Sequence, residues 1–467
     1  MSVPIRRQWF IESRTEKIKS DYDFLAEIGR GNFGRVFQAR HKETGVMRAI
    51  KVFIKALAQQ ADSFAIEIGI LRPLDHPNIV NLIETYEDEQ FLYLVFEYCS
   101  GNNIVDRITR DGITSEKRAS WIMRQIFSAL IYCHKHNIMH LDIKPDNCIY
   151  VNNSLDSDIK LIDFGMSAFI PTESEIVNYI RGTPHYIAPE VLSKQACCKS
   201  DCWSAGVMLY YLLTGKHPFN GNNSDEVLFN VRDGAISFQD PSFRSISSEA
   251  KYLIAKLVHK DVQTRFTAEQ AYNHPWIRLS DERPIIPLPQ EVIDNMTRFT
   301  SAKEMRRAAL MYISCKLNED ELNGLKTFFR QIDSDGDGFI NLEELQKTIM
   351  TRTSIPSRRL EFIVNGIDMN KNGIIDYREF IASCLGRQTY GNINKAKNAF
   401  RHFDLDGNGY ITSEELRRAL FQNVEFGLES GANVENMIID ADVNGDGRID
   451  YLEFLALLSI NSLHSLN

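Results

Sequence analysis

The chain contains 467 residues with a mass of 53.6 kDa, and at roughly 100–200 residues per domain this length predicts two to four domains. Hydrophobic residues make up 43% and charged residues 25%, a globular composition that excludes a disordered tail. No apolar run approaches the roughly 20 residues that span a bilayer, and no apolar signal segment follows the N-terminus.

The net charge of −9 lies entirely in residues 317–467, because residues 1–316 hold equal numbers of acids and bases. This imbalance argues against nucleic acid as a partner and favours a cation-binding C-terminal part. The eight cysteines form no CxxC pair, so we interpret them as reduced thiols of a cytoplasmic protein. Position 2 is serine, so the Met-Gly myristoylation pattern is absent. We also expect the protein to be a monomer.

The predicted elements begin with two alternating strands that start near Asp21 and end near Ala39, joined by a glycine-rich hairpin. A third strand is expected at residues 47–53. Helical periods then cover residues 60–71, 115–136 and 201–213. The coarse pattern up to Trp276 is a small β-rich part followed by a larger helical part.

Three prolines between Arg283 and Pro289 indicate a boundary. Residues 290–316 then predict one long helix or two, with an amphipathic pattern. Its apolar positions are Val292, Met296, Phe299, Met305, Ala309 and Tyr312. Lys303, Arg306 and Arg307 fall at i, i+3 and i+4, so they predict a separate basic face.

After Leu317 the chain repeats one unit four times, each with an aspartate-rich stretch of twelve residues. Each stretch fits D-x-[DN]-x-[DN]-G-x-I-x-x-x-E, in which positions 1, 3, 5 and 12 supply side-chain oxygens to Ca²⁺ and position 7 a carbonyl. Glycine at position 6 permits the sharp turn, and isoleucine at position 8 predicts a short strand between paired loops. The expected ligands are Asp333, Asp335, Asp337, Phe339 and Glu344; Asp368, Asn370, Asn372, Ile374 and Glu379; Asp404, Asp406, Asn408, Tyr410 and Glu415; and Asp442, Asn444, Asp446, Arg448 and Glu453.

A second set of motifs precedes residue 277. Residues 29–36 read Gly-Arg-Gly-Asn-Phe-Gly-Arg-Val, a G-x-G-x-x-G-x-V loop that by itself also fits a dinucleotide site. A strand rather than a helix follows the glycines here. Lys51 on the next strand can therefore reach nucleotide phosphates, and Glu67 on the following helix can pair with it.

Two further motifs complete this set, His-Leu-Asp-Ile-Lys-Pro-Asp-Asn at residues 140–147 and Asp-Phe-Gly at residues 163–165. Asp142 is expected to orient an attacking hydroxyl and Lys144 to neutralise the moving phosphoryl group. Asn147 and Asp163 are expected to hold Mg²⁺. Glu190 and Arg265 have the positions of a structural ion pair.

Through these motifs residues 23–277 resemble a eukaryotic protein kinase, and the whole chain resembles the calcium-dependent protein kinases of plants, apicomplexans and ciliates. The resemblance implies an α+β fold class, in which a bilobal protein-kinase fold precedes an all-α calmodulin-like domain of four EF-hands. The expected domains are an N-terminal extension (1–22), the kinase domain (23–277), a linker and junction helix (278–317), and EF-hands at 320–355, 355–390, 391–426 and 429–464.

The resemblance also implies the function, which is transfer of the ATP γ-phosphate to serine or threonine hydroxyls of proteins, with Mg²⁺. Calcium binding to the EF-hands is expected to relieve inhibition by the junction helix. The implied ATP-binding residues are Ile28, Gly29, Gly31, Gly34, Val36, Ala49, Lys51, Glu67, Glu97, Cys99 and Asp163, with Phe96 as gatekeeper. Two alternatives remain open: a constitutive kinase whose EF-hands buffer calcium, and a calcium-binding scaffold whose kinase lobe is inactive.

Two residues depart from the family pattern. Leu141 stands where the family usually has the arginine that gathers an activation-loop phosphate. Asn103 stands where the family usually has an acid that reads a basic residue upstream of the phosphosite or contacts the ribose. Which protein sequences the kinase prefers around the phosphosite therefore does not follow from the resemblance.

Overall fold

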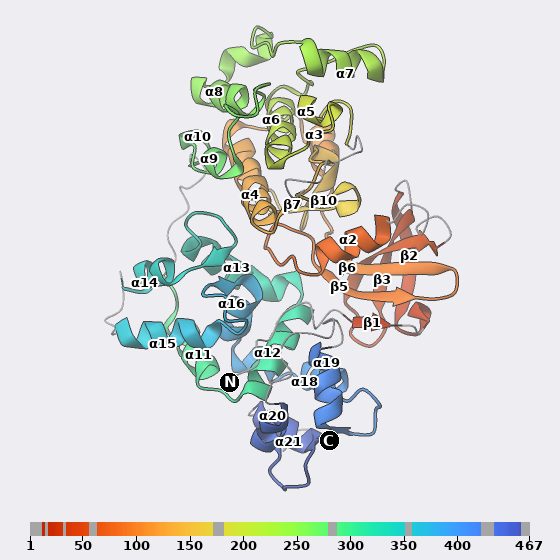
Figure 1. Ribbon diagram of the computed structural model, residues 1–467, viewed down its shortest axis with the longest axis vertical. Coiled ribbons are helices and arrows are strands. Elements are labelled where there is room, and N and C mark those ends of the chain that lie inside the picture. The colour runs from red at the N-terminus through yellow and green to blue at the C-terminus, as the bar shows by residue number, and fades with distance from the viewer. Residues whose placement is uncertain are drawn as a thin grey trace.

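The computed structural model describes residues 12–14, 17–30, 34–55, 63–170, 182–278, 287–350, 357–421 and 434–458. Most of the N-terminal extension, Gly31 of the hairpin and residues 279–286 of the predicted boundary lie outside these ranges. Figure 1 shows a strand-rich lobe, a helical lobe and a region of paired helices at the opposite end of the molecule from the helical lobe. The predicted α+β class, with a bilobal fold followed by a helical EF-hand region, is confirmed.

The small lobe is a six-stranded sheet in the order β1-β5-β6-β4-β3-β2. Its strands are β1 (Glu12–Arg14), β2 (Tyr22–Arg30), β3 (Gly34–His41), β4 (Met47–Ile54), β5 (Leu82–Glu87) and β6 (Phe91–Glu97). The three predicted strands correspond to β2, β3 and β4. β1 pairs in parallel with β5, so a piece of the N-terminal extension belongs to the sheet. Three residues are too few to carry a hydrophobic period, which is why the sequence did not predict this strand.

The helical lobe forms around two long helices, α4 (Glu116–Lys135) and α6 (Cys198–Thr214). Ser115 caps α4 by accepting a hydrogen bond from the Arg118 amide, and most of the apolar side chains of α4 are buried. The other helices of this lobe are α3 (Ile104–Asp111), α5 (Pro189–Leu192), α7 (Ser224–Asp233), α8 (Ser248–Leu257), α9 (Ala268–Tyr272) and α10 (Pro275–Arg278), whereas α2 (Ser63–Leu71) lies beside the sheet of the small lobe (Figure 1). Short strands are β7 (Ile138–Met139), β8 (Cys148–Tyr150), β9 (Ile159–Leu161) and β10 (Ala168–Phe169), with 3-10 turns at Ile18–Ser20, Pro145–Asn147, Phe164–Met166 and Pro241–Ser245.

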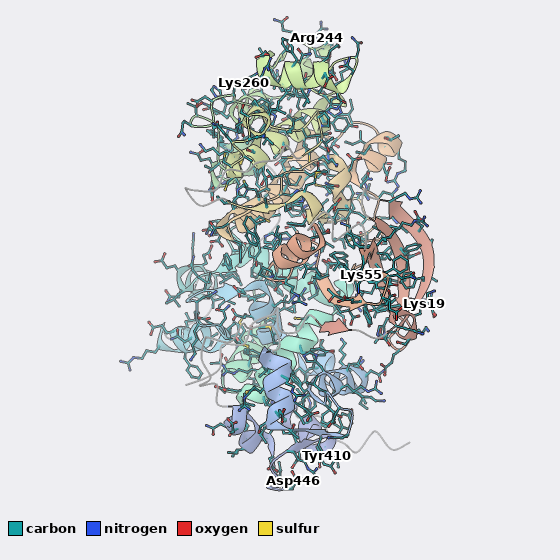
Figure 2. All side chains as sticks on the ribbon, turned by 45° about the vertical axis from the view of Figure 1, so that its right-hand side comes forward. Lys19, Lys55, Arg244, Lys260, Tyr410 and Asp446 are labelled. Carbon is teal, nitrogen blue, oxygen red and sulfur yellow. The ribbon has the colours of Figure 1, made fainter. Side chains whose placement is uncertain are left out.

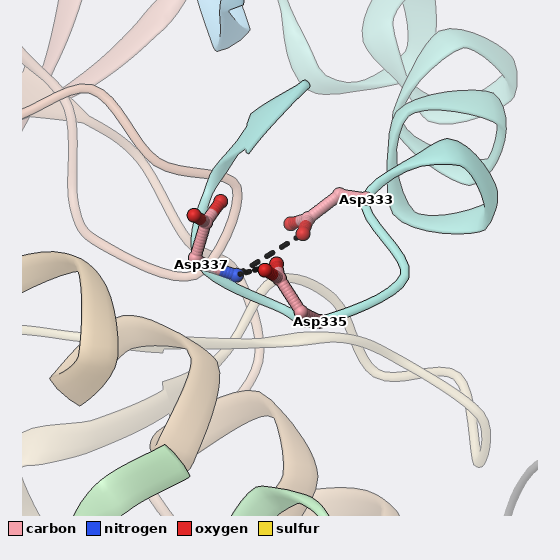
Figure 3. A group of neighbouring side chains, drawn as sticks. All are labelled: Asp333, Asp335 and Asp337. Atoms are coloured by element: carbon pink, nitrogen blue, oxygen red, sulfur yellow. Dashed lines mark hydrogen bonds between the residues drawn. The ribbon is translucent and has the colours of Figure 1, made fainter. Parts of the chain in front are cut away.

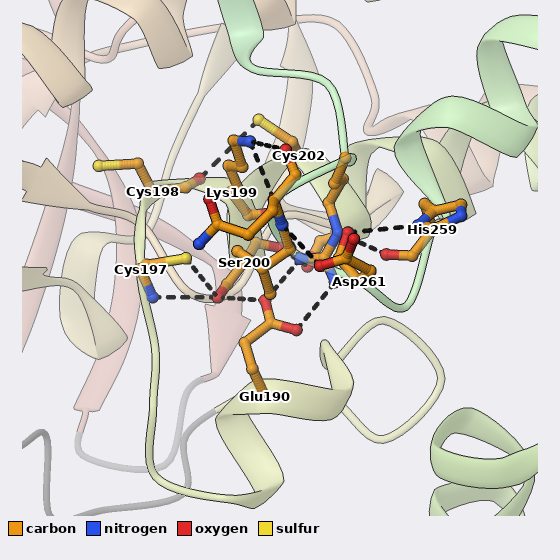
Figure 4. A network of polar contacts seen from close by, with 12 residues as sticks. Glu190, Cys197, Cys198, Lys199, Ser200, Cys202, His259 and Asp261 are labelled. Carbon is orange, nitrogen blue, oxygen red and sulfur yellow. Dashed lines mark hydrogen bonds and ion pairs between the residues drawn. The ribbon is translucent and has the colours of Figure 1, made fainter.

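A buried ion pair ties α5 to α6 and to the segment before α9. Arg265 Nη2 lies 2.9 Å from Glu190 Oε2, and the Arg265 side chain is fully buried. Ser200 Oγ in the first turn of α6 donates to Glu190 Oε1 at 2.7 Å, and Figure 4 shows Glu190 directed at Ser200. The predicted ion pair between Glu190 and Arg265 is confirmed.

Within its described residues, the C-terminal region contains four helix–loop–helix units preceded by two helices. The leading helices are α11 (Gln290–Thr300) and α12 (Glu304–Lys316). The units use α13 (Glu319–Ile332) with α14 (Leu342–Met350), α15 (Ser357–Ile367) with α16 (Tyr377–Cys384), α18 (Ile393–Phe403) with α19 (Ser413–Phe421), and α20 (Val434–Ala441) with α21 (Tyr451–Leu457). A short helix, α17 (Arg387–Tyr390), separates the two pairs. Figure 2 shows Tyr410 and Asp446 of the second pair at the end of the molecule opposite Arg244 and Lys260.

The apolar residues predicted for the junction segment are all buried in one core with the EF-hand helices. The segment forms two helices, because α11 ends at Thr300 and the chain turns before α12 begins. Lys303 is the N-cap residue of α12, and Arg306 and Arg307 lie in the first turn of that helix. The Lys303 ammonium contacts the Asp440 carbonyl, which belongs to the fourth EF-hand.

The other two residues of the predicted basic face also contact the EF-hand region. Arg306 Nη2 donates to the Tyr390 hydroxyl at 3.2 Å, and Arg307 Nη1 donates to the Gly366 carbonyl at 3.1 Å. The junction helices are thus held by the EF-hand region through apolar and polar contacts together. No helix within the described ranges combines the length and the apolar composition that a membrane span requires.

The first two EF-hands lie against the kinase lobes, and Figure 1 shows α13 and α16 on the side of the molecule that faces them. Arg378 Nε of α16 lies 3.0 Å from Asp75 Oδ1, in the loop after α2, and both side chains are buried. Arg330 Nη1 of α13 lies 2.8 Å from Asp158 Oδ1, just before β9. These pairs join parts of the chain that are far apart in sequence.

Candidate active site

Lys51 lies on β4, between β3 and β6, so its strand is fixed from both edges. Its ammonium lies 2.7 Å from Glu67 Oε1 on α2 and 2.9 Å from Asp163 Oδ1. Burial alone would lower the pKa of Lys51, but the Glu67 and Asp163 carboxylates raise it above its ordinary value. The ammonium is therefore charged at neutral pH and available to phosphate oxygens.

The loop between β7 and β8 brings the predicted catalytic residues together. Asp142 Oδ2 accepts hydrogen bonds from Lys144 Nζ at 2.7 Å and from Asn147 Nδ2 at 2.8 Å. Thr183 Oγ1 donates to Asp142 Oδ1 at 2.7 Å and accepts from Lys144 Nζ at 2.8 Å. A hydroxyl thus lies between the carboxylate and the ammonium, a contact that the sequence motifs did not predict.

The catalytic loop is supported from below by Asp201 of α6. Asp201 Oδ1 accepts from the Leu141 amide at 2.8 Å, and Oδ2 accepts from the His140 amide at 2.9 Å. Leu141 has a φ of 63°, which is strained for a branched residue. The hydrogen bonds from these two backbone amides to the fully buried Asp201 hold this conformation beside Asp142.

Apart from Glu67 on α2 and Asp163, the described residues implied for ATP binding lie on or just after four strands. Ile28 and Gly29 lie on β2, Gly34 and Val36 on β3, Ala49 and Lys51 on β4, and Glu97 and Cys99 at and after the end of β6. Phe96, the expected gatekeeper, pairs with Ala49 across β4 and β6 and is only 8% exposed. Gly31 lies outside the described residues.

The first calcium loop gathers three carboxylates. Figure 3 shows Asp333, Asp335 and Asp337 directed toward one another, and their oxygens lie within 4.8 Å. Burial and the neighbouring carboxylates, Asp337, Glu344 and Asp335 in that order, raise the pKa of Asp333 well above its ordinary value. A cation bound between the three carboxylates relieves that repulsion. Carboxylate oxygens are hard donors, so both the donor atoms and their arrangement in the loop fit Ca²⁺.

All four loops share the same turn. The position-6 glycines have φ angles of 82°, 86°, 89° and 83°, a region that favours glycine; they are Gly338, Gly373, Gly409 and Gly447. Each position-12 glutamate faces the start of its own loop, because it accepts a backbone hydrogen bond there; the donors are the amides of Ser334, Met369, Asp406 and Val443. Ile340 pairs with Ile375, and Ile411 with Ile449, so the predicted short strands are confirmed as β11 (Phe339–Ile340) with β12 (Ile375–Asp376) and β13 (Tyr410–Ile411) with β14 (Ile449–Asp450).

Comparison with protein families matches residues 22–277 to the protein kinase domain, and residues 322–385 and 393–459 to the EF-hand domain pair. The chain is 38% identical over 437 residues to calcium-dependent protein kinase 5 of Plasmodium falciparum, covering 93% of this chain and 77% of that relative. It is 36% identical over 448 residues to calcium-dependent protein kinase 34 of Arabidopsis thaliana, covering 95% and 85%. It is 35% identical over 460 residues to calcium-dependent protein kinase 3 of Plasmodium berghei, covering 97% and 83%.

The chain belongs to the calcium-dependent protein kinase family. Within this family, Leu141 has a clear structural consequence, because its side chain is buried in the core of the helical lobe. A leucine offers no donor to a phosphate, and no guanidinium stands beside Asp142 at this position. Thr183, a hydroxyl close to the active site, is already bonded to Asp142 and Lys144.

We therefore predict that this calcium-dependent protein kinase needs calcium but no phosphate between Asp163 and Glu190. Two further hydroxyls of that segment, those of Thr172 and Ser174, lie outside the described residues. Protein treated with phosphatase should respond to calcium as fully as untreated protein in a peptide phosphorylation assay. A treated protein that stays inactive until Thr172 or Ser174 is phosphorylated again would contradict the prediction.

Proposed function

We propose that this chain is a serine/threonine protein kinase that calcium switches on, with ATP as phosphoryl donor. The single observation that supports this most strongly is the joint presence of two constellations. Lys51 contacts Glu67 and Asp163 at one site, and Asp142 contacts Lys144 and Asn147 at the other. Four complete calcium loops follow in the same chain. Lys144, two residues after Asp142, favours serine and threonine over tyrosine as acceptors.

In the proposed reaction Lys51 binds the non-transferred phosphates of ATP, and Glu67 keeps its ammonium in place. Asp142 accepts a hydrogen bond from the substrate hydroxyl and orients it, while Lys144 neutralises the moving phosphoryl group. The bonds of Thr183 to both side chains support these roles, because they demonstrate that a hydroxyl fits between them. Asn147 and Asp163 would hold Mg²⁺, which neutralises phosphate charge when it is bound.

We further propose that calcium acts through the junction helices α11 and α12. Their apolar side chains share a core with the EF-hand helices, and Lys303, Arg306 and Arg307 contact EF-hand groups. Without calcium the EF-hands close, their hold on these helices weakens, and the released cations can enter the substrate cleft. A calcium-dependent bias of roughly 3–5.5 kcal/mol is enough to move the kinase from mostly off to mostly on.

The two alternatives are less well supported. An inactive scaffold does not need the contacts among Lys51, Glu67 and Asp163, yet all are made. EF-hands that merely buffer calcium do not need to contact the kinase lobes, yet Arg378 and Arg330 make buried or partly buried ion pairs there. Calcium activation is therefore the function that we propose.

We also propose a cytoplasmic monomer whose partners are protein substrates, ATP and Ca²⁺, without nucleic acid. All eight cysteines are free, which fits a reducing compartment. The acid excess of residues 317–467 disfavours binding to a polyanion.

The first prediction from this proposal concerns the chemistry. Asp142→Asn should lower kcat by about a hundredfold or more, because the hydroxyl loses its orienting carboxylate while the phosphate contacts remain. ATP affinity, measured by titration calorimetry, should stay within about threefold of the unmodified protein. The matched control is Asp225→Asn, an exposed aspartate on α7. Near-normal turnover of Asp142→Asn would disprove the role of Asp142.

The second prediction concerns the switch. Glu→Gln at position 12 of all four loops (Glu344, Glu379, Glu415 and Glu453) should leave ATP binding intact but the kinase inactive in calcium, because bidentate ligation is lost. Phosphorylation of a serine peptide is measured in calcium and in chelator. The matched control is Glu343→Gln with Glu414→Gln, which changes the residue just before a ligand in two loops. An active quadruple variant, or an unmodified protein fully active in chelator, would refute calcium activation.

A further inference from the structure

The first calcium loop lies on a surface of the helical lobe that the proposed reaction does not use. Ser128 Oγ of α4 donates a hydrogen bond to the Gly336 carbonyl at 2.9 Å. The Phe339 ring lies 5.2 Å from the Tyr132 ring and stacks on His136, with 5.7 Å between the ring centroids. Ser128, Tyr132 and His136 recur every four residues, which is the spacing of one helix face. Loop positions 4 and 7 are therefore held against this face.

The loop backbone also lies directly on side chains of the kinase. A Cβ atom at Gly336 would lie 2.2 Å from the Tyr272 ring, and a Cβ atom at Gly338 would lie 2.5 Å from the Tyr132 ring. Both distances are far shorter than van der Waals contact, so only glycine allows this approach. The calcium-binding backbone and the helical lobe are packed against each other.

Lys135, in the last turn of α4, contacts one of the expected calcium ligands. Its ammonium pairs with Asp337 Oδ2, while Asp337 Oδ1 accepts a hydrogen bond from the Phe339 amide at 2.8 Å. Burial alone would lower the pKa of Lys135, but its hydrogen bond to Asp337 raises it, so the ammonium is charged at neutral pH. Within the described ranges, none of the other expected ligands forms an ion pair with the kinase lobes. An effect of this lysine on calcium is therefore expected in the first loop alone.

We propose that Lys135 of the kinase lobe lowers the calcium affinity of the first EF-hand by pairing with Asp337. The number of ligand charges sets the affinity of an EF-hand. Lys135 offsets one carboxylate charge of this loop and also repels the divalent cation. The four carboxylates of the loop are those of Asp333, Asp335, Asp337 and Glu344. The kinase lobe thus sets the calcium concentration at which this loop fills. The inference rests on the proposed function in one respect, namely that the first loop binds calcium.

Removing the Lys135 charge has a definite consequence in this arrangement. Asp337 then keeps its full negative charge for calcium, so the first loop binds the ion more tightly. The Lys135 side chain is 44% exposed, so solvent and salt screen its charge and limit the effect to a few-fold. The contacts of Ser128 and of the Phe339 ring involve no carboxylate, so they remain in the variant. A lysine that only held the loop in place would have the opposite effect or none, because its removal cannot tighten calcium binding.

The test measures calcium binding by the full chain with isothermal titration calorimetry, without ATP or peptide. The background carries Glu379→Gln, Glu415→Gln and Glu453→Gln, so that only the first loop keeps its position-12 ligand. In this background Lys135→Met should raise the calcium affinity roughly fivefold at low salt and less at high salt. Lys135→Arg keeps the charge and should stay within about twofold of the background. The matched control is Lys117→Met, an exposed lysine in the first turn of α4, which should change nothing.

A second arm keeps the other three loops intact and decides the matter if the first loop binds too weakly in that background. Lys135→Met alone should lower the calcium concentration at half-saturation, and adding Glu344→Gln should remove this shift. Unchanged or weaker calcium binding by Lys135→Met in both arms would overturn the inference, as would a shift that persists with Glu344→Gln. An unmodified chain that is inactive in calcium, or fully active in chelator, would refute the proposed function and leave these binding results as they are.

Discussion

The buried ion pair between Arg378 and Asp75 is the contact on which the arrangement of this kinase depends. Both side chains are less than 10% exposed, so neither charge is stable there without the other. Arg378 Nη1 also donates to the Ser314 carbonyl of α12 at 2.6 Å. One guanidinium therefore joins the second EF-hand, the junction helix and the kinase lobes. Removing either side chain by substitution leaves the other as a buried charge without its partner, at a cost of about 3–5 kcal/mol.

Other contacts between the EF-hand region and the kinase also use cations of the EF-hand region. The EF-hand region is acidic overall, yet it presents cations to the kinase, namely Arg378 and Arg330. The first calcium loop itself touches the helical lobe: Ser128 Oγ donates to the Gly336 carbonyl at 2.9 Å, and Lys135 pairs with Asp337, a predicted calcium ligand. The first calcium loop thus carries both predicted calcium ligands and contacts with the kinase. Calcium binding at this loop can therefore directly affect how the EF-hands dock.

The sequence predicted the parts of the site whose chemistry requires fixed short spacings. Asp142, Lys144 and Asn147 lie within six residues, and each calcium loop within twelve, so local pattern alone brings those groups together. Lys51 and Asp163 lie 112 residues apart; each was predicted from its own motif, but the contact between them was not. Arg378 and Asp75 lie 303 residues apart and match no motif, so no sequence pattern pointed to their contact. The contact between Lys135 and Asp337 was missed for the same reason, since the two lie 202 residues apart. The break between α11 and α12 was left open, because Ser301 and Ala302 do not forbid a helix.

Hydrogen exchange of the kinase segments that contact the EF-hands tests most directly whether calcium holds the two parts together. Amides of residues 74–80 and 158–161, which flank the partners of Arg378 and Arg330, are followed in the full chain in calcium and in chelator. We predict slow exchange of both segments in calcium and markedly faster exchange in chelator, because undocking exposes them to solvent. Equal protection of both segments under the two conditions would contradict it.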